Sequence, residues 1–156
     1  MKPDTFLKKL ADDNAVQPGT HEISRPLPHA ERGRWKARHP GLKLPNDFLA
    51  FLKRANGVRF HLAPGRPLGA AGRLLPLREI QTATSLIYQD QEEEGEALPG
   101  AWLALSDDAE GDQILVIDAR KRLYLAVDPA DPEDALELGL RFEEALDWVF
   151  ARYLDF

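Results

Sequence analysis

Hydrophobic residues recur at helical spacing shortly before the middle of the chain. They fall at i, i+3, i+4 and i+7, which places all of them on one face of a helix: Phe48, Phe51, Leu52 and Ala55. Pro45 suits the first turn of such a helix, and Asp47 in that turn complements the positive end of its dipole. Asn56 and Gly57 both tolerate the left-handed conformation that a helix C-terminal cap requires. The pattern therefore predicts a helix that begins near Pro45 and stops at Asn56-Gly57.

Further helical patterns lie on both sides of this segment. Residues 4–13, 28–38 and 82–89 each carry apolar positions or end signals typical of a short helix. The connector over residues 14–30 is interrupted by prolines and a glycine, so we expect it to be irregular. The chain closes with its longest apolar stripe, which predicts a helix with a buried face: Phe142, Ala145, Leu146, Val149, Phe150 and Tyr153.

Five segments have the composition of short strands: Val58–Leu62, Arg73–Glu79, Trp102–Leu105, Gln113–Asp118 and Leu123–Val127. Pro76 indicates an edge position or a bulge for the second of them, because proline has no N–H to donate. The last three are joined by the short links 106–112 and 119–122, which favour antiparallel hairpins. Acidic loops are expected over 91–100 and 128–137. This order of elements predicts one α+β domain, with a small, largely antiparallel β-sheet packed against several helices.

Length and composition limit the class of protein. A chain of 156 residues, 44% hydrophobic and 29% charged, fits one globular domain. It has no cysteine, which excludes disulfides, thiol catalysis and thiolate metal sites. No segment approaches the roughly 18 consecutive apolar residues of a membrane span, and charged residues interrupt the N-terminal segment where a signal peptide would be hydrophobic. We therefore expect a cytoplasmic protein that does not contact membranes.

Charge is distributed unevenly along the chain. Residues 1–80 contain 15 Lys/Arg and 7 Asp/Glu, a net +8, whereas residues 81–156 contain 5 and 19, a net −14; together these give the total of −6. The acidic total argues against direct nucleic-acid binding, because neutralisation of phosphates dominates that affinity. It is compatible with a basic partner on the C-terminal half, unless folding mixes the charges of the two halves.

The segment Asp107-Asp108-Ala109-Glu110-Gly111-Asp112 is the strongest candidate for chemistry. Clustered carboxylates can hold a hard cation such as Mg²⁺ or Ca²⁺, and the corresponding hypothesis is a metal-dependent enzyme. The spacing does not match an EF-hand loop, and Asp and Gly are also the ordinary residues of a tight turn. We favour a solvated hairpin turn here and predict neither a metal nor another cofactor.

Two other acidic segments, 90–96 and 128–137, are candidates for partner binding. Complementary charge speeds the encounter with a basic protein and penalises other partners. The alternative is that these segments are solvated loops that only maintain solubility.

Four basic residues surround Trp35 at positions 32, 34, 36 and 38. Such a pattern can contact nucleic acid by stacking and phosphate pairing, but an aromatic side chain packed inward beneath basic side chains is the commoner arrangement. The four histidines form no i, i+4 pair, and the chain has no Walker loop, GxGxxG or GxSxG motif. The sequence therefore predicts no zinc site and no catalytic residue.

Several short motifs follow one another in a set order. They are Leu44-Pro45-x-Asp47-Phe48 with Asn56-Gly57, Leu74-Leu75-Pro76-Leu77 with Glu79-Ile80, Gly111-Asp112 before 114–118, Tyr124 to Asp128, and Phe142-x-x-Ala145-Leu146. In this order they resemble the SUKH superfamily, the group related to a yeast regulator of cell-wall synthesis. The resemblance covers roughly residues 36–155. It implies a SUKH-like α+β domain over 36–156, preceded by an extension over 1–35 that consists of a helix and a connector.

The resemblance implies a binding module and not an enzyme. Bacterial members are commonly immunity proteins that neutralise toxins, many of which are nucleases, and other members are regulatory adaptors. Our first hypothesis is therefore a non-catalytic immunity protein that occludes the active site of a cognate protein toxin, such as a basic nuclease domain. The second is a regulatory adaptor that binds a host protein. We expect the partner to contact acidic residues: Glu92, Glu93, Glu94, Glu96, Asp107, Asp108, Glu110, Asp112, Asp131, Glu133 and Asp134.

Overall fold

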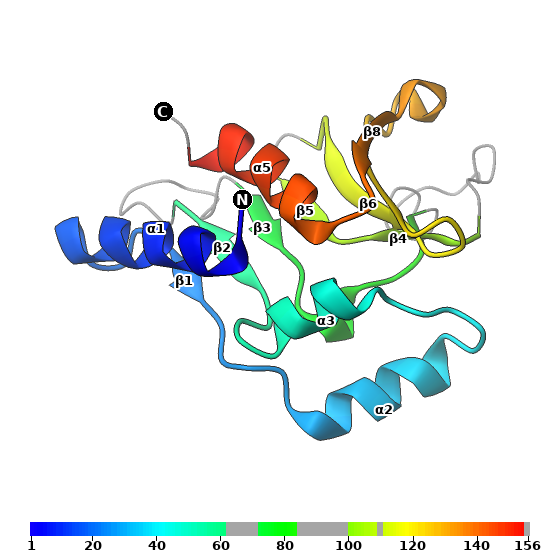
Figure 1. Cartoon of the computed structure of the whole chain (residues 1–156), viewed down its shortest axis with the longest axis horizontal. Helices are drawn as coiled ribbons and strands as arrows, with labels where there is room; N and C mark the ends of the chain where they lie inside the picture. The colour runs from blue at the N-terminus through cyan, green and yellow to red at the C-terminus, as the bar shows by residue number, and fades with distance from the viewer. Residues whose placement is uncertain (62–71, 84–99, 109–110, 155–156) are drawn as a thin grey trace.

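The structure is a computed structural model, which describes residues 1–61, 72–83, 100–108 and 111–154 (Figure 1). Its described α-helices are α1 (Pro3–Val16), α2 (His29–Arg38), α3 (Asn46–Leu52) and α5 (Phe142–Tyr153). The described residues also form two short 3₁₀ helices, η1 (Leu77–Glu79) and η2 (Pro132–Asp134).

The described strands form two antiparallel four-stranded sheets. Sheet A has the order β1 (Glu22–Ile23), β2 (Val58–Phe60), β3 (Gly72–Leu74) and β5 (Ser106–Asp108). Sheet B has the order β4 (Trp102–Ala104), β6 (Ile114–Asp118), β7 (Leu123–Val127) and β8 (Leu136–Gly139). These sheets and helices confirm the predicted α+β fold class, with the strands divided between two sheets.

Leu105 is the point at which the chain passes from sheet B to sheet A. Its N–H donates to the carbonyl of Leu115 in sheet B at 2.8 Å, and its own carbonyl accepts from the N–H of Leu75, just after β3, at 2.9 Å. Its side chain is completely buried. One residue therefore satisfies its backbone polar groups with one bond on each side of the junction.

The structure corrects several predicted element boundaries. The connector over 14–30 contains the two-residue strand β1, the expected turn over 106–112 begins with β5, and the expected loop over 128–137 contains η2 and β8. The strand predicted over 73–79 ends at Leu74, because Pro76 has no N–H for a ladder and a 3₁₀ turn follows it. The helix predicted over 82–89 lies almost entirely outside the described residues.

The helical stripes meet in one aromatic core. Phe6 of α1, Phe51 of α3 and Phe142 of α5 are each at most 1% exposed. Phe51 packs 6.1 Å from Phe6 and 5.1 Å from Phe142, measured between ring centroids, within the range of favourable aromatic pairs. Figure 1 shows α1 beside α5 although they lie at opposite ends of the chain. The first helix is therefore part of the same core as the predicted SUKH-like region.

Asp47 joins three elements that are distant in the sequence. From the first turn of α3, its carboxylate accepts the hydroxyl of Tyr124 on β7 at 2.9 Å and the backbone N–H of Phe142 at 2.6 Å. Phe142 is the first residue of α5, so Asp47 satisfies one of the free N–H groups at that helix's N-terminus. Burial, together with the charge of Asp47, raises the pKa of Tyr124, whose phenol stays protonated as a donor.

Asn56 has a different role from the helix cap predicted for it. α3 ends at Leu52, and of the pair Asn56-Gly57 only Gly57 has a positive φ, +105°. The buried amide of Asn56 accepts the N–H of Leu77 at 2.9 Å and donates to Glu31 of α2 at 3.1 Å. The residue thus holds α2 and η1 against the end of the α3 segment.

Within the part of the chain that the structure describes, none of the helices combines the length and the apolar character needed to cross a bilayer.

We expect Asp47→Ala to lower the free energy of unfolding by about 2–3 kcal/mol, because it leaves a buried phenol and a helix-terminal N–H without their acceptor. Asn46→Ala is the matched control: Asn46 is exposed on the same turn, and its replacement should cost less than about 0.5 kcal/mol. Urea unfolding followed by circular dichroism measures both. Equal losses for the two variants would contradict this role of Asp47.

Candidate functional site: an acidic edge of sheet B

Five carboxylates lie along the chain between the end of β7 and the middle of β8. We call them the acidic edge: Asp128, Asp131, Glu133, Asp134 and Glu137. All except the half-buried Asp128 are exposed. Among the described residues, no lysine or arginine forms an ion pair with any of the five. The acidic edge is therefore a concentration of negative charge without counter-ions from the described part of the protein.

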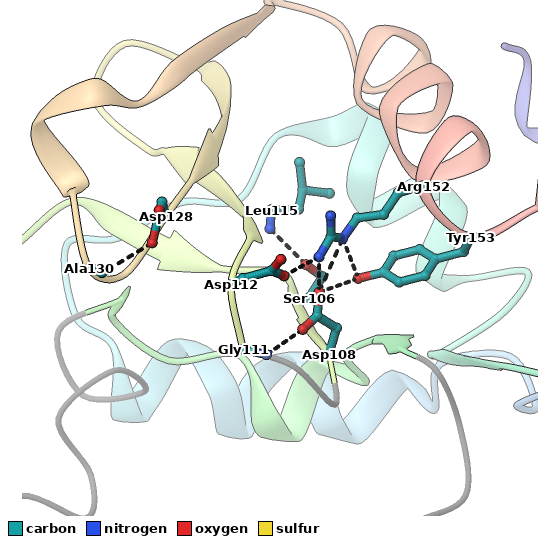
Figure 2. Close-up of polar contacts among 9 residues, drawn as sticks. All are labelled: Ser106, Asp108, Gly111, Asp112, Leu115, Asp128, Ala130, Arg152 and Tyr153. Atoms are coloured by element: carbon teal, nitrogen blue, oxygen red, sulfur yellow. Dashed lines mark hydrogen bonds and ion pairs between the residues drawn. The ribbon is translucent and has the colours of Figure 1, made fainter. Parts of the chain in front are cut away.

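Like charges crowd one another at this edge. The hydrogen bond and the charge of Asp134 raise the pKa of Asp131, and Glu133 and Asp128 act in the same direction. The carboxylate of Asp128 accepts the backbone N–H of Ala130 at 2.9 Å within a short turn. In Figure 2 it lies away from the other two labelled carboxylates, Asp108 and Asp112. A cationic partner placed here would relieve the repulsion between these groups.

The acidic edge lies beside an open strand with exposed apolar side chains. β8 pairs with β7 on one side, and no other described strand pairs with it. Leu136 at the start of β8 is 59% exposed, and Leu140 just after it is 66% exposed. An unpaired strand edge offers a row of N–H and C=O groups to another chain. Backbone pairing, apolar contact and negative charge are thus available on one surface.

The other acidic cluster is neutralised within the protein, as Figure 2 shows. Asp108 on β5 has a side chain only 2% exposed, and it accepts two hydrogen bonds from Arg152 of α5, from Nη2 at 2.5 Å and from Nε at 3.1 Å. Arg152 also pairs with the exposed Asp112. Burial alone lowers the pKa of Arg152, but its bonds to Asp108 and Tyr153 outweigh burial and raise it, so the guanidinium stays charged.

Tyr153 completes this cluster from the end of α5. Its hydroxyl donates to Asp108 at 3.2 Å, and its ring stacks on Phe60 of β2 at 5.0 Å between centroids. Burial and the charge of Asp108 raise the pKa of Tyr153, although Arg152 opposes them. A Cβ on Gly72 would lie 2.4 Å from the Tyr153 ring, so only glycine leaves room for the stack.

Asp107, Asp108 and Asp112 are each paired with an arginine of the protein. Asp107 faces Arg73 across the strand pair, 3.6 Å from its guanidinium, and the other two share Arg152. One carboxylate oxygen of Asp108 therefore forms a buried ion pair, which the sequence did not predict, while the other accepts the backbone N–H of Gly111 at 2.5 Å in the predicted turn. Among the described residues, no group of three His, Cys, Asp or Glu side chains is arranged to hold a metal ion.

The remaining predicted contact residues fall into two sets. Asp131, Glu133 and Asp134 lie together on the acidic edge, and their role in partner binding stays a prediction. The others lie outside the described residues: Glu92, Glu93, Glu94, Glu96 and Glu110.

Trp35 is packed inward, as the commoner arrangement predicted. It is 3% exposed, and its indole N–H donates to the carbonyl of Ile80 at 2.9 Å. Its ring stacks on His39 at 4.4 Å. In this position it is not an exposed surface platform of the kind that stacks on the bases of single-stranded nucleic acid.

His21 and His61, which are distant in the sequence, are in contact in the structure. The rings of His21 and His61 lie 4.8 Å apart, and Nδ1 of His21 accepts the backbone N–H of His61 at 3.1 Å. Nε2 of His21 lies 2.8 Å from a carboxylate oxygen of Asp13 on α1. Burial lowers the pKa of His21, although Asp13 opposes it. No local motif could have predicted this contact, since the residues come from three separate segments.

A model of the SMI1/KNR4 family (SUKH-1) matches residues 35–148. The match runs from within α2 to within α5 and confirms the resemblance that the ordered motifs indicated. No curated protein matches the chain.

Replacing Asp108 should be far more costly than replacing Asp112, although both carboxylates pair with Arg152. We expect Asp108→Ala to lower the free energy of unfolding by about 2–4 kcal/mol, because it leaves a partly buried guanidinium short of its partner. Asp112 is 57% exposed, so Asp112→Ala should cost below about 1 kcal/mol. Chemical denaturation of both variants tests this difference, and a larger loss for Asp112→Ala would refute it.

His21 should make the protein less stable in mild acid. Since its pKa is lowered from 6.5 in the fold, the unfolded chain binds the proton more readily, and stability falls as the pH drops below 6.5. Measurements stay above pH 5, where Asp13 remains ionised because its bonds to His21 and Lys9 outweigh burial and lower its pKa.

In His21→Gln we expect a smaller loss of stability between pH 7.5 and pH 5 than in the unaltered protein, as measured by urea unfolding at each pH. His29→Gln, at an exposed position, is the control and should leave the pH dependence unchanged. Parallel curves for His21→Gln and the unaltered protein would show that His21 does not cause the effect.

Proposed function

Because the chain belongs to the SMI1/KNR4 family (SUKH-1), we propose that it is a non-catalytic protein-binding module, an immunity protein that neutralises a cognate toxin. The observation that carries the proposal is the acidic edge without described counter-ions beside the open strand β8. We expect it to act in the cytoplasm, where it would meet the toxin before the toxin reaches its target.

The partner that this surface fits is a basic protein domain. Exposed carboxylates attract cationic side chains and speed association, an effect that is strongest at low salt. Leu136 and Leu140 supply apolar contact at the same place, and the free side of β8 can accept an added strand. For a nuclease toxin, whose own groove is basic, carboxylates in this arrangement would occupy the position of substrate phosphates.

The mechanism that follows is occlusion. An immunity protein of this kind needs no catalytic group, because it blocks the toxin's active site sterically. It binds the toxin through complementary charge and backbone pairing. Asp108 and Asp112 belong to the acidic segment that was the strongest candidate for chemistry, and both are paired with Arg152. Asp108 holds β5 against α5, and Asp112 holds the turn after β5 to the same arginine.

Charge reversal on the acidic edge tests the proposal. Asp131→Lys/Asp134→Lys should slow association with the partner roughly tenfold or more at low salt, because the approach of a basic surface becomes repulsive. Asp4→Lys/Asp12→Lys makes the same change in net charge on α1 and should leave association unchanged. The unaltered protein and both variants are used as bait in native lysate at low and high salt, and captured proteins are identified by mass spectrometry.

The captured protein is then purified and its kinetics are measured against each variant. A partner with a toxin domain, inhibited at one-to-one stoichiometry by the unaltered protein, supports immunity. A partner with a housekeeping role would replace immunity by the adaptor hypothesis. Equal association of both double variants would show that the acidic edge is not the binding surface.

A further inference from the structure

A concave surface lies at the other end of the molecule, against α2. It is a cavity of about 360 Å³ between α2 and the segment that connects it to α3, within the range of about 300–1,000 Å³ typical of small-molecule sites. Its floor is apolar, formed by Trp35, Leu42, Leu44, Leu49 and Leu77. Figure 1 shows α2 far from β8, so this cavity is separate from the acidic edge.

The rim of this cavity is basic and lacks described counter-ions. Arg32, Lys36 and Lys43 line it, and none of the described lining residues is acidic. Within the described part of the chain, none of these three cations takes part in an ion pair. In a protein with a net charge of −6, this concentration of unpaired positive charge selects for an anion.

Arg32 gives a second, independent indication. Its Nε is buried and has no hydrogen-bond partner, the only such side-chain atom among the described residues. Buried polar groups in folded proteins are nearly always paired, so an unpaired donor is an unfavourable state that an acceptor would relieve. Arg32 lines the cavity, and its guanidinium offers two parallel donors that match a carboxylate.

The floor is held in place before any ligand binds. The indole N–H of Trp35 is fixed by the carbonyl of Ile80 at 2.9 Å, and its ring is stacked on His39 with an interplanar angle of 21°. Leu44 and Leu77 are at most 3% exposed. A ligand would therefore meet a preformed apolar surface and would not have to order it, which favours binding.

The larger hollow on the open face of sheet A does not show the same selectivity. It measures about 510 Å³, and its arginines are balanced by carboxylates: Arg73 pairs with Glu79 at 2.8 Å and lies 3.6 Å from Asp107. Its charges favour no single class of ligand. The cavity against α2 is the more specific site.

We propose that the cavity between α2 and the α2–α3 connection binds a small monocarboxylate with an apolar body about the size of two fused aromatic rings. The carboxylate pairs with Arg32, with Lys36 and Lys43 beside it, and the apolar body lies against the parts of Trp35 and the leucines that line the cavity. The proposal is independent of the toxin-binding role, because the two surfaces share no residue.

The test uses the full-length protein and naphthoate as the probe, with naphthylmethylammonium and naphthol as probes of the same shape and different charge. Isothermal titration calorimetry at low salt should show submillimolar binding of naphthoate and much weaker binding of the other two. In nuclear magnetic resonance spectra, naphthoate should shift the Trp35 indole and the amides of residues 41–44. Shifts confined to other parts of the protein would overturn the assignment of the site.

Variants separate the pocket from general attraction of anions. Arg32→Gln should weaken naphthoate about tenfold or more, since a hydrogen bond to a charged group is lost, and Lys43→Gln should weaken it to a smaller extent. Lys53→Gln, an exposed cation of the neighbouring helix segment that does not line the cavity, is the control and should not change affinity. Equal weakening by Lys53→Gln, or no measurable binding of naphthoate, would overturn the proposal.

Folding of the Arg32 variant can be checked separately. Because Arg32 makes no ion pair and its Nε no hydrogen bond among the described residues, Arg32→Gln should leave the melting temperature unchanged or slightly raised. A loss of naphthoate binding at unchanged stability then reports on the site itself.

Discussion

The carboxylate of Asp47 accepts hydrogen bonds from a tyrosine on β7 and from the first backbone N–H of α5, while lying in the first turn of α3. Each of these groups would otherwise lack a strong acceptor, and Tyr124 itself is completely buried. The contact fixes where α5 begins. Since α5 is rigid, it also fixes where its far end places Arg152 and Tyr153 against β5. The two ends of one helix thereby connect the α3 corner to the junction between the sheets.

Acidic residues serve two opposite purposes in this molecule. Asp47 and Asp108 hold distant elements together, because each meets hydrogen-bond donors that are partly or fully removed from water. The carboxylates of the acidic edge meet no described cation and repel one another. A charge of the first kind contributes to stability, whereas a charge of the second kind is available to a partner. In the same way, the cations that line the cavity against α2 form no ion pair with a described residue and are available to an anionic ligand.

The parts of the fold that the sequence predicted are those stabilised by local periodicity. α3 and α5 carry stripes that place their apolar residues on one face, and β6 and β7 are joined by a turn short enough to require a hairpin. β1, β5 and β8 are two to four residues long, and each exists because a distant strand pairs with it. Each of them also contains acidic residues, which are uncommon in strands, so that its composition is that of a loop: Glu22, Asp107, Asp108 and Glu137.

The sequence by itself determined the α+β class, the family resemblance and the inward packing of Trp35, since these depend on spacing and composition that any fold of the chain must respect. It also located the acidic segments. Only the tertiary structure decided which carboxylates are free, because pairing depends on residues such as Arg152 that lie more than forty positions away from Asp108 in sequence. The meeting of His21 with His61, and the cation-lined cavity against α2, have the same origin. Contact in space between distant segments is set by how the helices pack, and no local pattern encodes it.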